Sequence, residues 1–283
     1  MDKLHKEIAE SEYNSYEVGK PATTSQDYLI GTTLDFNDNR SGNGEQIYAI
    51  ASDGSNVLPN APLSERAKVK EITLLYRGST NPLGLFTGKA GEVGRDWGSN
   101  NTVLGLKIGT GQRGVTGQLE ASAAYLKEIM EKYPNAKINI YGHSLGSMDA
   151  QYALACITDY SRINEAYIYN GPNIYSLLSY SQKVNVSALY AKIHNYVDSE
   201  DIIGLGYNKG EGAVGQVYKF VGLDKKTVPM LVGEEIAGLL GAMLGLAYGA
   251  FADQHMWGGY DFDADGNLID RYGRRVKAWE KPE

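Results

Sequence analysis

Residues 138–146 read INIYGHSLG, and residues 147–155 continue as SMDAQYALA. The first part is a short β-branched and aromatic run, typical of a buried strand, and the second part has the composition of a helix. Between them, the Gly-x-Ser-x-Gly pattern of residues 142–146 indicates a tight turn that lifts Ser144 out of the backbone. A Cβ at Gly142 or Gly146 would collide with the neighbouring strand or helix. We therefore expect Ser144 to act as a nucleophile rather than only as a helix cap, with the positive end of the helix directed at a developing oxyanion.

The composition limits the classes of protein to which the chain can belong. With 283 residues, 42% of them hydrophobic and 22% charged, it has the length and composition of a globular protein with one large α/β domain or two small ones. The formal net charge of -7 argues against nucleic acid as a partner and against electrostatic capture by an anionic membrane. The single cysteine, Cys156, excludes an internal disulfide.

Predicted strands and helices alternate along most of the chain. Residues 1–45 are polar, and we expect a short N-terminal helix followed by a loop, separate from a main domain at 46–283. The pattern in that domain predicts an α/β fold with a mostly parallel central sheet and helices on both faces. The predicted strands are 46–52, 69–76, 138–141, 166–169 and 191–197, with a helix at 118–133 and an edge strand of a hairpin at 215–221.

A serine nucleophile needs a histidine base, and in this class of fold the order along the chain is serine, acid, histidine. The four histidines are His5, His143, His194 and His255. His5 is in the polar leader, His143 is part of the turn itself, and His194 precedes the acidic candidates. His255 is therefore the predicted base.

The acid is expected just after the strand at 191–197, where Asp198, Glu200 and Asp201 are clustered. Asp201 precedes an apolar turn that would hold its carboxylate against the imidazole, so we favour it. Asp198 ends the strand directly and is the alternative acid.

Two backbone N–H groups are needed to bind the oxyanion. Leu145, the residue after the nucleophile, is expected to supply one. The second is expected from Ser79, in the segment after the strand at 69–76, where Gly78 allows the backbone to approach closely. The neighbouring Arg77 is expected to form a structural ion pair.

At this point the chain resembles the class 3 lipases, which are α/β-hydrolases related to the fungal triacylglycerol lipases, phospholipase A1 and bacterial relatives. The resemblance rests on YRGS at 76–79, GHSLG at 142–146, NGP at 170–172, DII at 201–203 and His255, and it covers about residues 46–270. It implies a nucleophile, acid and base at Ser144, Asp201 and His255, and an oxyanion hole at Ser79 and Leu145.

The chain departs from that family's pattern at two places. Gly146 is followed by Ser147 where family members often have a second glycine, and the acid is followed by Ile203-Gly204 where they tend to have Val-Pro. The second departure keeps Asp198 open as the acid.

Residues 236–252 contain no charged side chain, and glycines recur there at 241, 245 and 249. This run lies within an apolar insertion at about 228–252. It is short for a transmembrane span, which needs about 20 apolar residues. We expect either a tightly packed buried helix or a lid that contacts lipid.

Residues 261–267 read DFDADGN, which resembles the start of a calcium loop. Tyr272 stands where the loop glutamate would be, so we predict an Asp-Gly hairpin turn and no metal site.

These features together predict a serine lipase that hydrolyses carboxylic esters of lipids through an acyl-enzyme, with no cofactor. Phospholipase A-type release of fatty acid is preferred because of the apolar run at 236–252, which would also make transient contact with a membrane surface. The alternatives are a triacylglycerol lipase or short-chain esterase, and a non-enzymatic lipid-binding protein on a lipase scaffold. Residues 1–7 lack the apolar core of an ordinary signal peptide, which predicts a cytoplasmic protein or export by a non-Sec route, with secretion favoured for a lipase.

Overall fold

The computed structural model describes residues 2–78, 116–201, 204, 206–207, 212–223 and 254–279. Within these residues, one eight-stranded sheet and one small two-stranded sheet are formed. The large sheet consists of β1 (Pro21–Thr23), β2 (Leu29–Asp38), β3 (Gln46–Ala51), β4 (Glu71–Tyr76), β5 (Lys137–His143), β6 (Ile163–Tyr169), β7 (Ile193–Asp198) and β8 (Gln216–Phe220), and the small sheet of β9 (Asp261–Phe262) and β10 (Leu268–Ile269). The α-helices are α1 (Asp2–Glu10), α2 (Leu63–Arg66), α5 (Gly117–Lys132), α6 (Leu145–Ala155) and α7 (Tyr180–Ala188). Short 3-10 turns span Ser11–Tyr13, Tyr160–Arg162, Tyr175–Leu177 and Tyr190–Lys192, and a π-helical turn spans Gln254–Gly258.

The strands of the large sheet follow one another in chain order from β1 to β8. β1 to β4 pair antiparallel, and β4 to β8 pair parallel. The predicted α/β fold with a mostly parallel central sheet is therefore confirmed. The predicted edge strand at 215–221 is present as β8, which lies parallel to β7 at the end of the described strand order, and a hairpin partner directly after residue 223 would lie outside the described residues.

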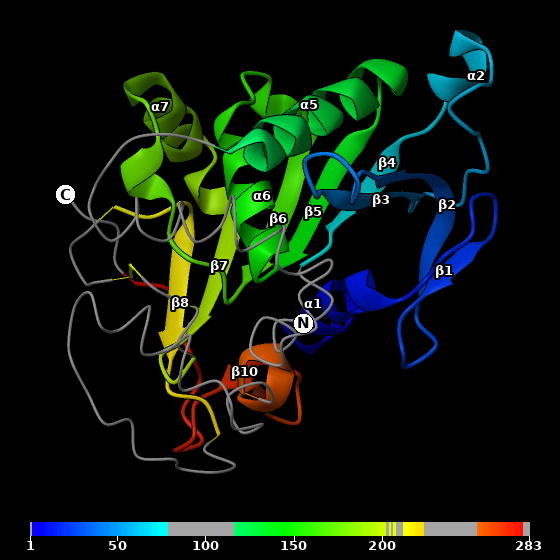
Figure 1. Ribbon diagram of the computed structural model, residues 1–283. Coiled ribbons are helices and arrows are strands. Elements are labelled where there is room, and N and C mark those ends of the chain that lie inside the picture. Colours follow the sequence, from blue (N-terminus) through cyan, green and yellow to red (C-terminus); the bar gives the residue numbers. More distant parts are fainter. Residues whose placement is uncertain are drawn as a thin grey trace.

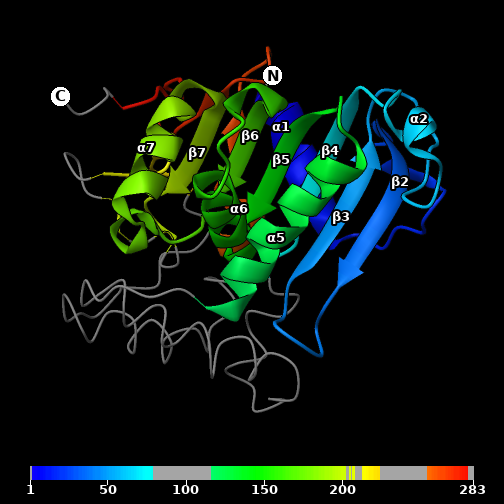
Figure 2. The ribbon, with the colours of Figure 1, turned by 90° about the horizontal axis from the view of Figure 1, so that it is seen from above.

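Helices cover both faces of the sheet, as predicted. Crossovers between neighbouring parallel strands are right-handed, so a strand order that advances in one direction places the connecting helices on one face. Figures 1 and 2 show α5, α6 and α7 together on this face, with α1 on the opposite face. Residues 254–268, drawn orange to red in Figure 1, also lie on the side of α1.

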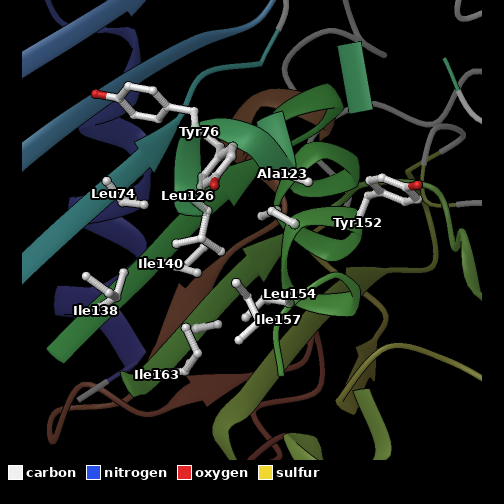
Figure 3. Packing of buried hydrophobic residues seen from close by; sticks show 14 of the residues in the cluster. Leu74, Tyr76, Ala123, Leu126, Ile138, Ile140, Tyr152, Leu154, Ile157 and Ile163 are labelled. Atoms are coloured by element: carbon white, nitrogen blue, oxygen red, sulfur yellow. The ribbon is translucent and has the colours of Figure 1, made fainter. Parts of the chain in front are cut away.

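The alternation of side chains along the strands produces two hydrophobic cores. On β4, Ile72 and Leu74 face the helices α5 and α6, whereas Leu75 faces the opposite side. Figure 3 shows the first core, in which side chains of β4 to β6 meet those of α5 and α6. The second core lies under α1 and residues 254–268 and is rich in aromatic side chains: Tyr48, Tyr141, Tyr169, Tyr196, Phe220, Trp257 and Tyr260.

The N-terminal segment differs from the prediction of a separate polar leader over residues 1–45. Its helix is present as α1, but the predicted loop contains β1 and β2, and β2 pairs with β3 from Thr32 to Asp38. Ile8 and Ala9 of α1 are buried in the second core. Residue 45 is therefore not a domain boundary. The strand was missed because β2 carries polar residues at several positions, which hides its alternation.

The apolar insertion predicted at 228–252, with the run at 236–252, lies outside the described residues. Among the helices that the structure does describe, none combines the length and the apolar character needed to cross a membrane.

Candidate active site

The turn around Ser144 has the strained geometry expected from its glycines. Ser144 connects β5 to α6 with φ 57° and ψ -121°, a conformation that costs a non-glycine residue about 1–3 kcal/mol. A Cβ on Gly142 would lie 2.5 Å from the carbonyl oxygen of Gly146, and one on Gly146 would overlap the carbonyl oxygen of Tyr76. The Ser144 N–H donates to the Tyr169 carbonyl at 2.9 Å, which fixes the turn to the end of β6. The two glycines are thus required by the close approach of neighbouring backbone.

Ser144, His255 and Asp201 form one hydrogen-bonded series. The His255 Nε2 atom lies 2.8 Å from Ser144 Oγ, and its Nδ1 atom lies 2.7 Å from Asp201 Oδ2. All three residues are buried, with exposed fractions of 1%, 2% and 6% for the serine, histidine and aspartate. The structure therefore brings together the predicted nucleophile, base and acid, although His255 is 111 positions from Ser144 and 54 from Asp201 in the sequence.

The chemistry of these three side chains determines which atom carries each proton. An ionised carboxylate only accepts hydrogen bonds, so His255 Nδ1 carries a proton and donates it to Asp201. In the neutral imidazole, Nε2 is then the acceptor, and the Ser144 hydroxyl donates to it. A base with its free nitrogen directed at a serine hydroxyl can remove that proton when the oxygen attacks an electrophile.

Asp198, the alternative acid, has a different set of contacts. Its Oδ1 atom accepts the N–H groups of Glu200 and Gly222, each at 3.0 Å. The Asp201 N–H donates to the Asp198 carbonyl at 3.1 Å, and this tight turn after β7 directs the Asp201 side chain to His255. Asp201 is therefore the carboxylate in contact with the imidazole.

The two predicted oxyanion donors have different outcomes. Leu145 is the first residue of α6, and in the part of the chain that the structure describes no group accepts its N–H. Ser79 lies outside the described residues, which end at Gly78 on this side. A Cβ on Gly78 would lie 2.7 Å from the His143 carbonyl oxygen and 3.3 Å from Ser144 Cβ, so Gly78 is in direct contact with the turn. Arg77 donates from its Nη2 atom to the Tyr13 carbonyl at 3.1 Å, and among the described residues it forms no ion pair.

His143 holds the backbone of His255, a role that the sequence analysis did not assign. Its Nε2 atom lies 2.7 Å from the His255 carbonyl oxygen, which can only accept, so Nε2 carries the proton. Burial, and then the nearby His255, lower the pKa of His143 well below its usual range, which keeps the ring neutral. Nδ1 is therefore an acceptor, and the Tyr13 hydroxyl donates to it at 2.8 Å.

Asn170, directly after β6, is a second residue that supports the site. It has φ 47°, and its side-chain oxygen accepts the Asp198 N–H and the Tyr260 hydroxyl, both at 3.0 Å. Its Nδ2 atom lies 3.4 Å from the His255 carbonyl oxygen. The Asn-Gly-Pro sequence at 170–172, directly after the strand next to β5, is the sequence feature that points to this position.

Glu12 is a third residue that the sequence did not indicate. It is fully buried, and its two carboxylate oxygens accept the N–H groups of Gly78 and His143, at 3.0 and 3.2 Å. Burial raises the pKa of Glu12 well above its usual range, although these two N–H groups and the nearby Arg77 act in the opposite direction.

The other candidates from the sequence lie away from this site. His5 stacks on Tyr167, and His194 lies 2.8 Å from the carboxylate of Glu165. Residues 263–267 form the turn of the β9–β10 hairpin, in which Asp263 accepts hydrogen bonds from the turn itself. Within the described ranges, no group of three or more His, Cys, Asp or Glu side chains is arranged to hold a metal ion.

Comparisons with known proteins give matches of low identity. A family model described as Mbeg1-like matches residues 108–215, which is less than half of the chain. No curated protein has significant similarity to the sequence. Among solved structures, a triacylglycerol lipase whose catalytic centre is described as a serine protease triad is similar at 14% identity over 77% of both chains, with a TM-score of 0.43.

Two further lipase structures are similar to the same degree. The Rhizomucor miehei lipase in complex with its propeptide has 14% identity over 76% of this chain and 66% of that chain, with a TM-score of 0.44. A nonglycosylated Yarrowia lipolytica lipase has 12% identity over 77% of both chains, with a TM-score of 0.42. The roles of this chain's residues rest on the geometry described above.

Proposed function

We propose that the protein is a serine hydrolase that cleaves carboxylic esters of lipids. The observation that carries the proposal is the buried series of hydrogen bonds from Asp201 through His255 to Ser144, which ends on a serine held at positive φ at the start of a helix. A serine that only capped α6 would need neither the base nor the acid, and its side chain makes no capping hydrogen bond. A binding protein has no use for this combination of groups.

The geometry supports a two-step acyl transfer. Ser144 Oγ attacks the ester carbonyl carbon while His255 Nε2 takes its proton, and Asp201 holds the imidazolium in place. The Leu145 N–H stabilises the negative oxygen of the tetrahedral intermediate, together with the expected donor at Ser79. His255 returns the proton to the leaving alcohol, and a water molecule activated by the same base releases the acid.

The lipid substrate is the finer part of the proposal. The charge-free run at 236–252 ends three residues before His255 and supports an apolar substrate or a membrane surface. We prefer phospholipase A-type activity on this ground. Hydrolysis of triacylglycerol or of short-chain esters by the same residues is the second candidate.

The experiment compares the wild type with Ser144→Ala and with Ser147→Ala as the matched control. Ser147 is a buried serine one turn further along α6, where its Oγ accepts a hydrogen bond from Gln151. Each protein is treated with a fluorophosphonate probe and assayed for fatty acid release from phosphatidylcholine vesicles, triolein emulsion and a p-nitrophenyl butyrate solution. Labelling and hydrolysis are expected in the wild type and Ser147→Ala, with a loss of about 10⁵–10⁶-fold in Ser144→Ala.

The outcomes separate the candidates. Faster release from vesicles than from the other two substrates supports phospholipase A-type activity, and preference for triolein or the butyrate ester supports the second candidate. Labelling of Ser144 without hydrolysis of any of these esters would mean that the nucleophile is active but the substrate class is wrong. Absence of both labelling and hydrolysis in the wild type would refute a serine hydrolase.

A further inference from the structure

Glu12 connects the ends of two neighbouring strands beside the candidate nucleophile. Its Oε1 atom accepts the N–H of Gly78, which follows β4, and its Oε2 atom accepts the N–H of His143, the last residue of β5. The carboxylate comes from the 3-10 turn at Ser11–Tyr13, which precedes every strand of the sheet. It is therefore a bridge supplied from outside the two strands that it joins.

The bridge stands where the pairing of β4 with β5 ends. The last pair in the parallel register is Tyr76 with Gly142. Beyond this pair β5 enters the turn at Ser144, and the chain after β4 continues to Gly78. A carboxylate is suited to this position because each of its oxygens can accept one N–H, whereas a glutamine offers only one acceptor oxygen. Glu12 thus replaces the strand-to-strand hydrogen bonds that are lost at this point.

The two bridged residues lead directly to the two expected oxyanion donors. Ser79 follows Gly78, and Leu145 is two residues beyond His143. Gly78 itself has little freedom to move toward the turn, because the His143 carbonyl and the Tyr13 hydroxyl already contact the space where its Cβ would be. The distance between the backbone after β4 and the turn is therefore fixed from both sides, by packing and by the carboxylate.

We propose that Glu12 is a positioning residue that sets the spacing between Gly78 and the nucleophile turn, and so holds the Leu145 N–H of that turn in place relative to the end of β4. This proposal rests on the proposed serine hydrolase function. Arg77 contributes to the same arrangement, since its Nη2 atom donates to the carbonyl of Tyr13 and holds the 3-10 turn against the end of β4. A misplaced N–H donor stabilises the transition state less, while binding of the ground-state substrate changes little. Loss of Glu12 should therefore lower kcat rather than raise KM.

The test uses Glu12→Gln, with Glu71→Gln as the matched control. Glu71 lies at the opposite end of β4, where its carboxylate also reaches the neighbouring strand, accepting the Asn139 side chain at 2.8 Å. The measurements are kcat and KM for p-nitrophenyl butyrate, per serine titrated by a fluorophosphonate, and the affinity for an alkylboronic acid. A boronic acid forms a tetrahedral, anionic adduct with the serine and so reports the oxyanion donors.

In Glu12→Gln we expect kcat to fall between about tenfold and hundredfold, less than the 10²–10³-fold loss typical of removing an oxyanion donor completely. The affinity for the boronic acid should fall by the same factor, and KM should change by less than about twofold. Glu71→Gln should keep wild-type kcat, KM and boronic acid affinity. A kcat per titrated serine within twofold of the wild type in Glu12→Gln would overturn the proposal, as would a rise in KM that accounts for the whole loss.

If Glu12→Gln does not fold, Gly78→Ala tests the same spacing between the end of β4 and the nucleophile turn. An added methyl group would displace the backbone after β4 from the Tyr13 hydroxyl and the His143 carbonyl, and we expect the same pattern of lowered kcat with KM retained. Wild-type kcat in a folded Gly78→Ala protein would count against the positioning role. A wild type that neither reacts with the fluorophosphonate nor hydrolyses the ester would instead refute the serine hydrolase itself.

Discussion

Replacement of His5 by phenylalanine should remove much of the acid sensitivity of the fold. His5 lies on α1, where its ring stacks on Tyr167 with centroids 3.7 Å apart and its Nδ1 atom lies 2.9 Å from the Tyr141 hydroxyl. Burial lowers its pKa from 6.5 to about 4, and the electrostatic interaction with His194 acts in the same direction, while Asp2 opposes both. The ring is therefore neutral at pH 7 and resists protonation while α1 is docked on the sheet.

The sign and size of the effect follow from these values. Because the folded-state pKa is below the unfolded value, the contribution of His5 to stability is complete above about pH 6.5 and is lost as the pH falls toward 4. A fall in pKa from 6.5 to about 4 corresponds to about 3 kcal/mol in total. About 2 kcal/mol of this is lost by pH 5.

The assay is urea denaturation between pH 4.5 and 7.5 for the wild type, His5→Phe and Lys3→Gln. The phenylalanine keeps the stacking on Tyr167 but cannot be protonated, and Lys3 is an exposed residue of the same helix that serves as the control. Between pH 7.5 and pH 5, the wild type should lose about 2 kcal/mol more than His5→Phe, and Lys3→Gln should follow the wild type. If the pH profiles of His5→Phe and the wild type are parallel within about 0.5 kcal/mol, or if the His5 ring titrates near pH 6.5 by NMR, the reasoning is refuted.

Three further predictions concern the candidate site. Asp201→Asn should lower kcat by about 10³–10⁴-fold, because the amide no longer fixes the tautomer of the imidazole. Asp198→Asn keeps an acceptor oxygen for the backbone N–H groups and should retain kcat within about tenfold of the wild type. Equal losses of kcat in the two variants, measured by steady-state kinetics, would contradict this. Gly146→Ala should reduce the free energy of unfolding by about 3 kcal/mol or more, since the added methyl group overlaps the Tyr76 carbonyl. The measurement is urea denaturation, and an unchanged midpoint of the unfolding transition would show that the turn can relax. Tyr13→Phe removes the hydroxyl that donates to His143 and should lower the free energy of unfolding by about 1–3 kcal/mol in the same assay. A decrease of less than about 0.5 kcal/mol would be inconsistent with this hydrogen bond.

The parts of the fold that could be predicted are those whose signals are local. The strand–turn–helix around Ser144 is encoded within 18 consecutive residues, from 138 to 155. The order of chemistry-bearing residues then selected His255 by elimination, and the series of hydrogen bonds joins it to Ser144 and Asp201. The helix α7 had a local signal that was not used, a capping box formed by Ser179 and Gln182.

The supporting residues could not be predicted, because their contacts join distant parts of the chain. Glu12 contacts Gly78 and His143, 66 and 131 positions away, and Tyr13 contacts His143 over 130 positions. A glutamate in a polar N-terminal segment has the same local pattern whether it is exposed to solvent or buried against a strand end. Only the position of α1 on the sheet distinguishes the two.

The arrangement of the two cores has a consequence for synthesis of the chain on the ribosome. The helices of the first core lie between the strands that they cover, so this face can be closed as soon as each helix–strand pair has emerged. The aromatic face receives its cover from α1, made first, and from residues between Met256 and Val276, made late. Among the described residues, α1 is the helix that covers the tyrosines of β5 to β7 until the segment from Met256 to Val276 has left the ribosome. The nascent protein therefore exposes the aromatic face of its sheet longer than the opposite face. We expect its yield of folded protein to depend on chaperones that shield aromatic surface during translation.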